Sequence, residues 1–257
     1  IFSASRWDPT GQDSRDFEIA YSEFTDCVDG VFLGNVANVR FHHNLLDNVS
    51  DDGLFFTAGT AYDGTTPGGG AQVYQNRFAR CLTTFAFGVG HGRQRTTAEG
   101  SQTGAGIDIY RNVFDFRGPV MYYWPTGPDA PQELSSLGRF AGDHGSPAWE
   151  PTRTYNNTVR AGDPPRYDYG TDGLGRATGK GTSRKVLNNI VCQKVGMIGQ
   201  TLPDPKADFV ADANLFWSLT DGPTFHGEIF SKFRNSAAFD ESKQSYSPGW
   251  TKHDQPT

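Results

Sequence analysis

The sequence predicts an all-β fold, a right-handed single-stranded parallel β-helix with long loops along one side. Three observations predict this solenoid. A short motif recurs at intervals of 22 to 45 residues, apolar and polar residues alternate through the copies, and the segments between copies are rich in Gly, Pro, Asp and Thr. Gly (31), Pro (15) and Phe (19) are plentiful among the 257 residues, which favours strands and turns over helices.

Each copy of the motif contains an alternating strand, then Asn, then any residue, then a large apolar residue. The Asn positions are Asn44, Asn76, Asn112, Asn157, Asn189 and Asn214, and Ser22 takes the equivalent place in an earlier coil. Asn tolerates the left-handed conformation of a sharp bend, and its amide can bond nearby backbone. Because stacked coils lie about 4.8 Å apart, we expect each Asn to adopt that conformation and the six side chains to form a ladder.

The apolar residues around each Asn are expected to form two interior columns. One contains Leu46, Phe78, Phe114, Val159, Val191 and Phe216, and the other contains Phe41, Val73, Ile109 and Val186. The coils are expected over residues 17–217 of a single domain, 1–257, with a loop or tail over 218–257. An antiparallel sandwich is the alternative, but no two-residue hairpin signal separates adjacent strands. Insertions, the longest over 124–151, leave successive coils at one phase and should build a cleft on one side.

Composition excludes several other kinds of protein. The net charge is −6 without a basic run, so nucleic acid is not an expected partner, and no apolar run could span a membrane. Three cysteines, Cys27, Cys81 and Cys192, do not form a disulfide framework and are expected to be small buried side chains. Because no capping helix is evident, we expect the chain to belong to a longer polypeptide, or to stack on another segment or a second copy.

On this coil pattern, residues 17–217 resemble the pectate-lyase-like superfamily of parallel β-helix proteins. The resemblance implies a secreted or cell-surface protein that meets a polysaccharide or oligosaccharide, acidic more than neutral. The superfamily includes lyases, polygalacturonase-type hydrolases, epimerases, tailspikes and adhesins, and the fold does not choose among them. Two functions therefore stay open: an enzyme that cleaves a polysaccharide by hydrolysis or β-elimination, and a non-catalytic glycan-binding or self-assembling module.

An acidic group follows the first two copies of the motif: Asp26, Asp29, Asp47, Asp51 and Asp52. Asp29 and Asp51 share one offset from Ser22 and Asn44, so their backbones should be stacked. Clustered carboxylates retain a proton or bind a cation. Asp29, Asp51 and Asp52 are therefore candidate acid and base residues of an inverting hydrolase, across a gap of about 6.5–9.5 Å. Asp47, Asp51 and Asp52 are alternatively candidate Ca²⁺ ligands, and a third alternative is that the Asp-Gly steps are turn residues only.

This acidic group is similar to the polygalacturonase pattern, in which Asn-Thr-Asp, Asp-Asp and Gly-His-Gly follow on consecutive coils. Asp29, the Asp51–Asp52 pair and His91 would match its three parts. The chain departs from the pattern in two ways. Cys27-Val28 replace Asn-Thr, and Thr83-Thr84, not His91, occupies the equivalent place in the third coil. The later Arg-Ile-Lys element of that family has no counterpart.

A second group of candidates is basic and aromatic, as acidic sugars require, since Arg binds carboxylates and aromatic faces stack on sugar rings. For β-elimination, His91, His144 or Tyr122 could be the base and Arg93 could neutralise the uronate; no Lys precedes Lys180. His42 and His43 are interpreted as structural, one facing outward and one toward the bend. The predicted substrate-binding residues are Arg93, Arg95, Tyr122, Tyr123, Trp124, Asp143, Trp149, Arg166 and Tyr167.

Overall fold

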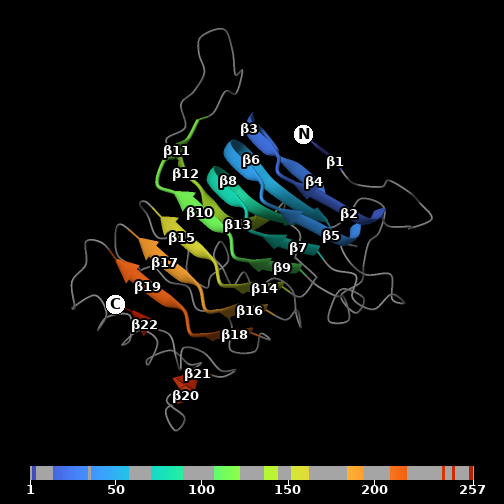
Figure 1. Cartoon of the computed structure of the whole chain (residues 1–257). Helices are drawn as coiled ribbons and strands as arrows, with labels where there is room; N and C mark the ends of the chain where they lie inside the picture. Colours follow the sequence, from blue (N-terminus) through green and yellow to red (C-terminus); the bar gives the residue numbers. More distant parts are fainter. Residues whose placement is uncertain are drawn as a thin grey trace.

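The computed structural model describes residues 2–3, 14–33, 36–57, 71–88, 107–121, 136–143, 152–161, 184–193, 209–218, 239–240, 245–246 and 255–256. All regular elements within these residues are β-strands, and no helix occurs among them. Most strands belong to two large sheets whose strands all pair in parallel, and Figure 1 shows them stacked in chain order from blue to orange. The prediction of an all-β fold with parallel sheets is therefore confirmed.

The seven-stranded sheet contains the strands that precede the ladder positions. In spatial order they are β18 (Phe209–Asp212), β16 (Arg184–Leu187), β14 (Thr152–Tyr155), β9 (Ile107–Tyr110), β7 (Ala71–Tyr74), β5 (Val36–His42) and β2 (Ser14–Ala20). Each strand pairs with the equivalent strand of the next coil; for example, Phe41 lies opposite Val73, and Val73 opposite Ile109.

The eleven-stranded sheet contains the strands that follow the ladder positions. Its order is β1 (Phe2–Ser3), β4 (Val31–Leu33), β6 (Leu45–Thr57), β8 (Arg77–Gly88), β10 (Val113–Phe116), β15 (Thr158–Ala161), β17 (Ile190–Gln193), β19 (Leu215–Ser218) and β22 (Gln255–Pro256). β3 (Glu23–Cys27) also pairs with β6, and β13 (Arg139–Asp143) with β8. Two small antiparallel pairs join β11 (Pro119–Val120) to β12 (Ser136–Leu137) and β20 (Phe239–Asp240) to β21 (Ser245–Tyr246).

Strand pairing departs from the expected boundaries in three places. β1 and the start of β2 precede residue 17, and β22 lies in the expected tail. β13 falls inside 124–151, which the sequence predicted as a loop, and pairs along β8 from Arg139 to Asp143. The motif does not reveal β13 because no ladder Asn precedes it directly.

The six Asn side chains form the predicted ladder at the corner between the two sheets. Each Nδ2 donates to the Oδ1 of the next Asn at 2.9–3.1 Å, from Asn44 to Asn214. Each Nδ2 also donates to a backbone carbonyl of the preceding coil at 2.9–3.0 Å. Backbone N–H groups fill the remaining acceptor sites, and the Ser22 N–H joins the column through Asn44 Oδ1 at 3.0 Å. All six residues are at most 3% exposed, so the ladder satisfies its own buried polar groups.

The left-handed conformation belongs to the residue before each ladder position, not to the Asn as predicted. Those residues have φ of 55–59° and are Tyr21, His43, Gln75, Arg111, Asn156, Asn188 and Ala213. Turning the chain one residue early leaves the Asn pointing into the corner. It is therefore the buried amide that selects Asn at these positions.

Both interior columns are confirmed for the residues whose side chains the structure describes. Leu46, Phe78, Phe114, Val159 and Val191 are fully buried and in register. Phe41, Val73 and Ile109 are likewise buried and in register, and the buried Thr154 lies between Ile109 and Val186 in the same column. The Phe78 and Phe114 rings stack with centroids 5.1 Å apart. All three cysteines are free, and only Cys81 is fully buried.

Candidate functional site

A one-residue bulge in β6 places Asp51 and Asp52 opposite Asp29. Cys27 is opposite Val49, and Val31 is opposite Leu54, so β6 has one more residue than the chain between β3 and β4. The same register shift, between Val49 and Asp52, separates β6 from β8. Bulges redirect side chains in this way, and they are frequent beside functional sites.

The bulge brings Asp29, Asp51 and Asp52 together. Their carboxylate oxygens lie within 4.8 Å of one another, with Asp29 and Asp51 half-buried and Asp52 buried. Backbone hydrogen bonds between the two neighbouring segments hold the cluster in place. The Asp51 N–H donates to the Val28 carbonyl and the Gly30 N–H donates to the Asp52 carbonyl, both at 2.8 Å. The shared offset in the sequence therefore correctly predicted the proximity of Asp29 and Asp51.

Glycines allow the coils to approach closely beside this cluster. A Cβ on Gly30 would lie 2.5 Å from the Gly53 carbonyl oxygen, and one on Gly53 would lie 2.8 Å from that of Thr84. The two Asp-Gly steps are therefore more than turns, because their glycines permit the strand contact that stacks the aspartates.

The spacing of the three carboxylates limits their chemistry. Charges this close repel one another, and a shared proton or a bound cation relieves the repulsion. A separation within 4.8 Å is shorter than the about 6.5–9.5 Å typical of inverting hydrolases. The cluster suits oxygen ligands around a divalent cation or carboxylates that share a proton.

Asp47 and Asp26 do not join this cluster. Asp47 accepts two hydrogen bonds from Arg80, from Nε and from Nη2, each at 2.6 Å. This bidentate contact raises the pKa of Arg80, and it directs Asp47 away from the role of a Ca²⁺ ligand that the sequence suggested. Asp26 accepts from Asn48 Nδ2 at 2.8 Å.

Thr83 and Arg139 extend the column on the far side of Asp52. Asp52 pairs with Thr83 in register, and Thr83 pairs with Arg139. The Arg139 Nε donates to Thr83 Oγ1 at 2.9 Å. The sequence analysis missed Arg139 because it lies in the predicted loop; the apolar pair Phe140-Ala141 that follows it, both residues buried, was the available signal.

Most of the predicted basic and aromatic residues lie outside the described part of the chain, and their roles stay predictions. They are His91, Arg93, Arg95, Tyr122, Tyr123, Trp124, His144, Trp149, Arg166 and Tyr167. Asp143 ends β13 opposite Phe87, and the structure describes its backbone alone.

A described aromatic column lies on the outer face of the seven-stranded sheet. His42, Tyr74, Tyr110 and Tyr155 stack with centroids 4.6–5.1 Å apart. Burial raises the pKa of Tyr110 and of Tyr155. Because the rings cover one another's faces, the column is a structural stack and not a platform for sugar rings.

Comparison of the chain with protein-family models, with curated proteins and with solved structures gave no match. In the described part of the chain, no helix is long and apolar enough to cross a membrane.

Proposed function

We propose that the protein is a secreted or cell-surface right-handed parallel β-helix that cleaves an acidic polysaccharide at the Asp29–Asp51–Asp52 cluster. We infer the right-handed sense of the helix from the strong preference of connections between parallel strands for right-handed crossovers. The observation that supports the site is the convergence of three carboxylates from adjacent coils, built by a bulge and by two close-packed glycines. Arg139, in the same column, supplies the positive charge that a uronate carboxylate requires.

In hydrolysis, one carboxyl of the cluster gives its proton to the glycosidic oxygen. A second, ionised carboxylate attacks the sugar carbon as that bond breaks and forms a glycosyl ester, which suits carboxylates this close together. The first carboxylate then takes a proton from the water that hydrolyses the ester. Because the three groups lie so close together, a cation held by the same oxygens is the alternative: it would bind the uronate carboxylate and favour removal of the neighbouring carbon-bound proton. His91 and His144 stay the predicted bases for that elimination.

The test is a screen of acidic polysaccharides with the full chain. New reducing ends without ultraviolet absorbance indicate hydrolysis, and the absorbance of an unsaturated uronate indicates elimination. We expect Asp51→Asn and Asp52→Asn to lower turnover at least about 100-fold, as loss of a general acid or base does. Asp26→Asn is the matched control, because its amide oxygen still accepts from Asn48 and it lies outside the cluster.

Chelation separates the two uses of the cluster. If a chelator abolishes cleavage and Ca²⁺ restores it, the aspartates hold a cation; if it has no effect, they act as acid, base and nucleophile. Wild-type protein that binds these polysaccharides and yields no product from any of them contradicts the enzyme proposal and favours the non-catalytic glycan-binding module.

A further inference from the structure

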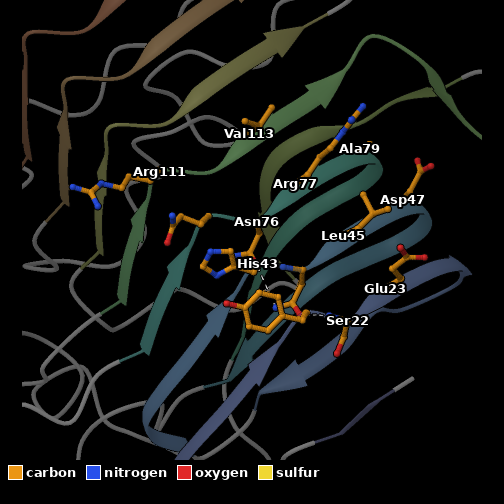
Figure 2. A pocket seen from close by; sticks show the side chains of 13 residues that line it. Ser22, Glu23, His43, Leu45, Asp47, Asn76, Arg77, Ala79, Arg111 and Val113 are labelled. Carbon is orange, nitrogen blue, oxygen red and sulfur yellow. Dashed lines mark hydrogen bonds between the residues drawn. The ribbon is translucent and has the colours of Figure 1, made fainter.

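A groove of about 800 Å³ runs along the outside of the Asn corner, and none of the three clustered aspartates lines it. Its floor is the start of the ladder, at Ser22, Asn44 and Asn76. Figure 2 shows Glu23, Leu45, Arg77 and Val113 in a row on one side, and His43 and Arg111 on the other. Four successive coils contribute to it, so at about 4.8 Å per step it is about 14 Å long.

The floor of the groove cannot select a ligand. The Asn44 and Asn76 amides already bond the neighbouring Asn residues and the backbone. Recognition therefore belongs to the two walls.

Glu18 and the buried His42 orient His43, which lies on the same side of the groove as Arg111 (Figure 2). The His42 Nε2 lies 2.8 Å from Glu18 Oε1, and the His42 Nδ1 lies 2.7 Å from His43 Nδ1. When His42 donates from Nε2 to Glu18, its Nδ1 accepts from His43 Nδ1, and Nε2 is then the acceptor nitrogen of the His43 ring. His42 is 6% exposed whereas His43 is exposed, as the alternation predicted.

Tyr21 closes the same wall at one end of the groove. Its ring stacks on His43 with centroids 4.9 Å apart. Tyr21 is nevertheless 77% exposed, so its ring offers an accessible apolar surface against which the C–H groups of a sugar can pack.

The charges of the walls favour an anionic ligand. The Arg77 side chain is 62% exposed, and its one ion pair among the described residues is with Asp115, at 3.5 Å. Asp115 already accepts two hydrogen bonds from Arg117 at 2.7 Å, which lower its pKa. Arg111 has no ion pair among the described residues.

The acidic residues of the groove do not cancel this charge. Asp47 is held by Arg80, which leaves Glu23, at the Tyr21 end, as the remaining carboxylate among the lining residues. Leu45 and Val113 add apolar surface between the charged positions. The two sides of the groove therefore present cationic, aromatic and aliphatic groups along its length, which suits the binding of an extended acidic sugar chain.

We propose that this groove is a second binding site, for a linear acidic oligosaccharide. Arg77 and Arg111 bind its carboxylates, and a sugar hydroxyl donates to His43 Nε2. The site holds the polymer along the solenoid and takes no part in bond cleavage; it shares with the proposed function only the class of ligand.

The test is calorimetric binding of oligogalacturonates to the full chain carrying Asp51→Asn, with the fully methyl-esterified oligomers as neutral probes. We expect the acidic oligomer to bind, and Arg77→Ala, Arg111→Ala and His43→Asn each to weaken binding about tenfold, the loss expected for a charge-assisted or specific hydrogen bond. Arg160→Ala removes an exposed arginine of the same face that does not line the groove, and should change affinity less than about twofold.

Three results would overturn the groove proposal. One is equal binding of the esterified and acidic oligomers. Another is an affinity of the Arg77 and Arg111 variants that matches the Arg160 variant while their thermal unfolding is unchanged. The third is absence of binding to any probe. Failure of the proposed cleavage is distinguishable from failure of the groove proposal, because binding is measured in the Asp51→Asn background, which removes turnover at a residue that does not line the groove.

Discussion

At the scale of single residues, the corner of each coil is a compromise between a strained residue and a buried amide. Seven residues, from Tyr21 to Ala213, adopt the left-handed backbone conformation, with φ of 55–59°. For a residue other than Gly, Asn or Asp this costs about 1–2 kcal/mol. The buried hydrogen bonds of the next residue offset that cost wherever the ladder continues.

Ala213→Asn should stabilise the protein by about 0.5–1 kcal/mol, because Asn tolerates the left-handed conformation better than Ala. The two preceding coils already have Asn at this place, and Asn188 Nδ2 donates to Asn156 Oδ1 at 2.5 Å on the exposed side of the corner. The substitution extends that pair by one coil. Urea unfolding measures the change. Ala213→Val is the control and should destabilise, since a branched side chain is poorly accommodated at positive φ; a lower stability of the Asn variant contradicts the reasoning.

The residue scale also shows how far the sequence alone leads. The ladder and the interior columns were predictable because the corner demands an amide and the position two residues later demands an apolar side chain. The strained position was not predictable, because Tyr, His, Gln, Arg, Asn and Ala all occupy it. The orientation of His43 was equally hidden, because it depends on Glu18 in the neighbouring coil.

At the scale of elements, the site depends on β6, the longest strand, and on its fit against β3, β4 and β8. Equal offsets from the ladder predicted the stacking of Asp29 and Asp51. The bulge that adds Asp52 leaves no mark in the motif, because it is visible only as a register shift between paired strands. Arg139 was missed for a similar reason, since β13 pairs with β8 and the motif detects only coils that carry an Asn.

Gly30→Ala should destabilise the protein by about 2 kcal/mol, the usual cost of forcing a methyl group into a packed contact. Its Cβ would lie 2.5 Å from the backbone oxygen of Gly53, which cannot move aside without disturbing the strand that carries Asp51 and Asp52. Gly118→Ala is the matched control. Its Cβ would meet only the Arg80 side chain, at 3.2 and 3.3 Å, and that chain can shift. Thermal and urea unfolding of the two variants give the comparison, and equal losses would show that the close approach at Gly30 does not matter.

At the scale of the whole molecule, the interior is uneven along the stack. The buried phenylalanines concentrate around β6, β8, β10 and β13: Phe56, Phe78, Phe85, Phe114, Phe116 and Phe140. Beyond them the described apolar interior consists of smaller side chains, Val159, Ala161, Val186 and Val191. A larger buried apolar area stabilises a segment more, and in a stack each coil touches only its neighbours. The coils around β8 should therefore open less often than those around β17.

Two buried thiols can measure this difference in local stability. Cys81 lies among the phenylalanines and is 0% exposed; burial raises the pKa of its thiol well above the ordinary value, so it should react with a disulfide reagent only when the coil opens. Val191→Cys, placed in a chain with Cys27, Cys81 and Cys192 changed to Ala, puts a thiol at an equally buried position of β17. The matched partner keeps Cys81 and carries Cys27→Ala and Cys192→Ala.

In rising urea we expect the thiol in β17 to be labelled at a lower denaturant concentration than Cys81, whose labelling should coincide with the loss of far-ultraviolet circular dichroism. Each variant's own unfolding curve corrects for any change in its overall stability. Labelling of both thiols at the same midpoint would mean that the stack opens as a single cooperative unit. The phenylalanine cluster would then stabilise all the coils together. The Asn ladder, which is continuous from Asn44 to Asn214, would couple the two regions strongly enough to outweigh the difference in their side-chain packing.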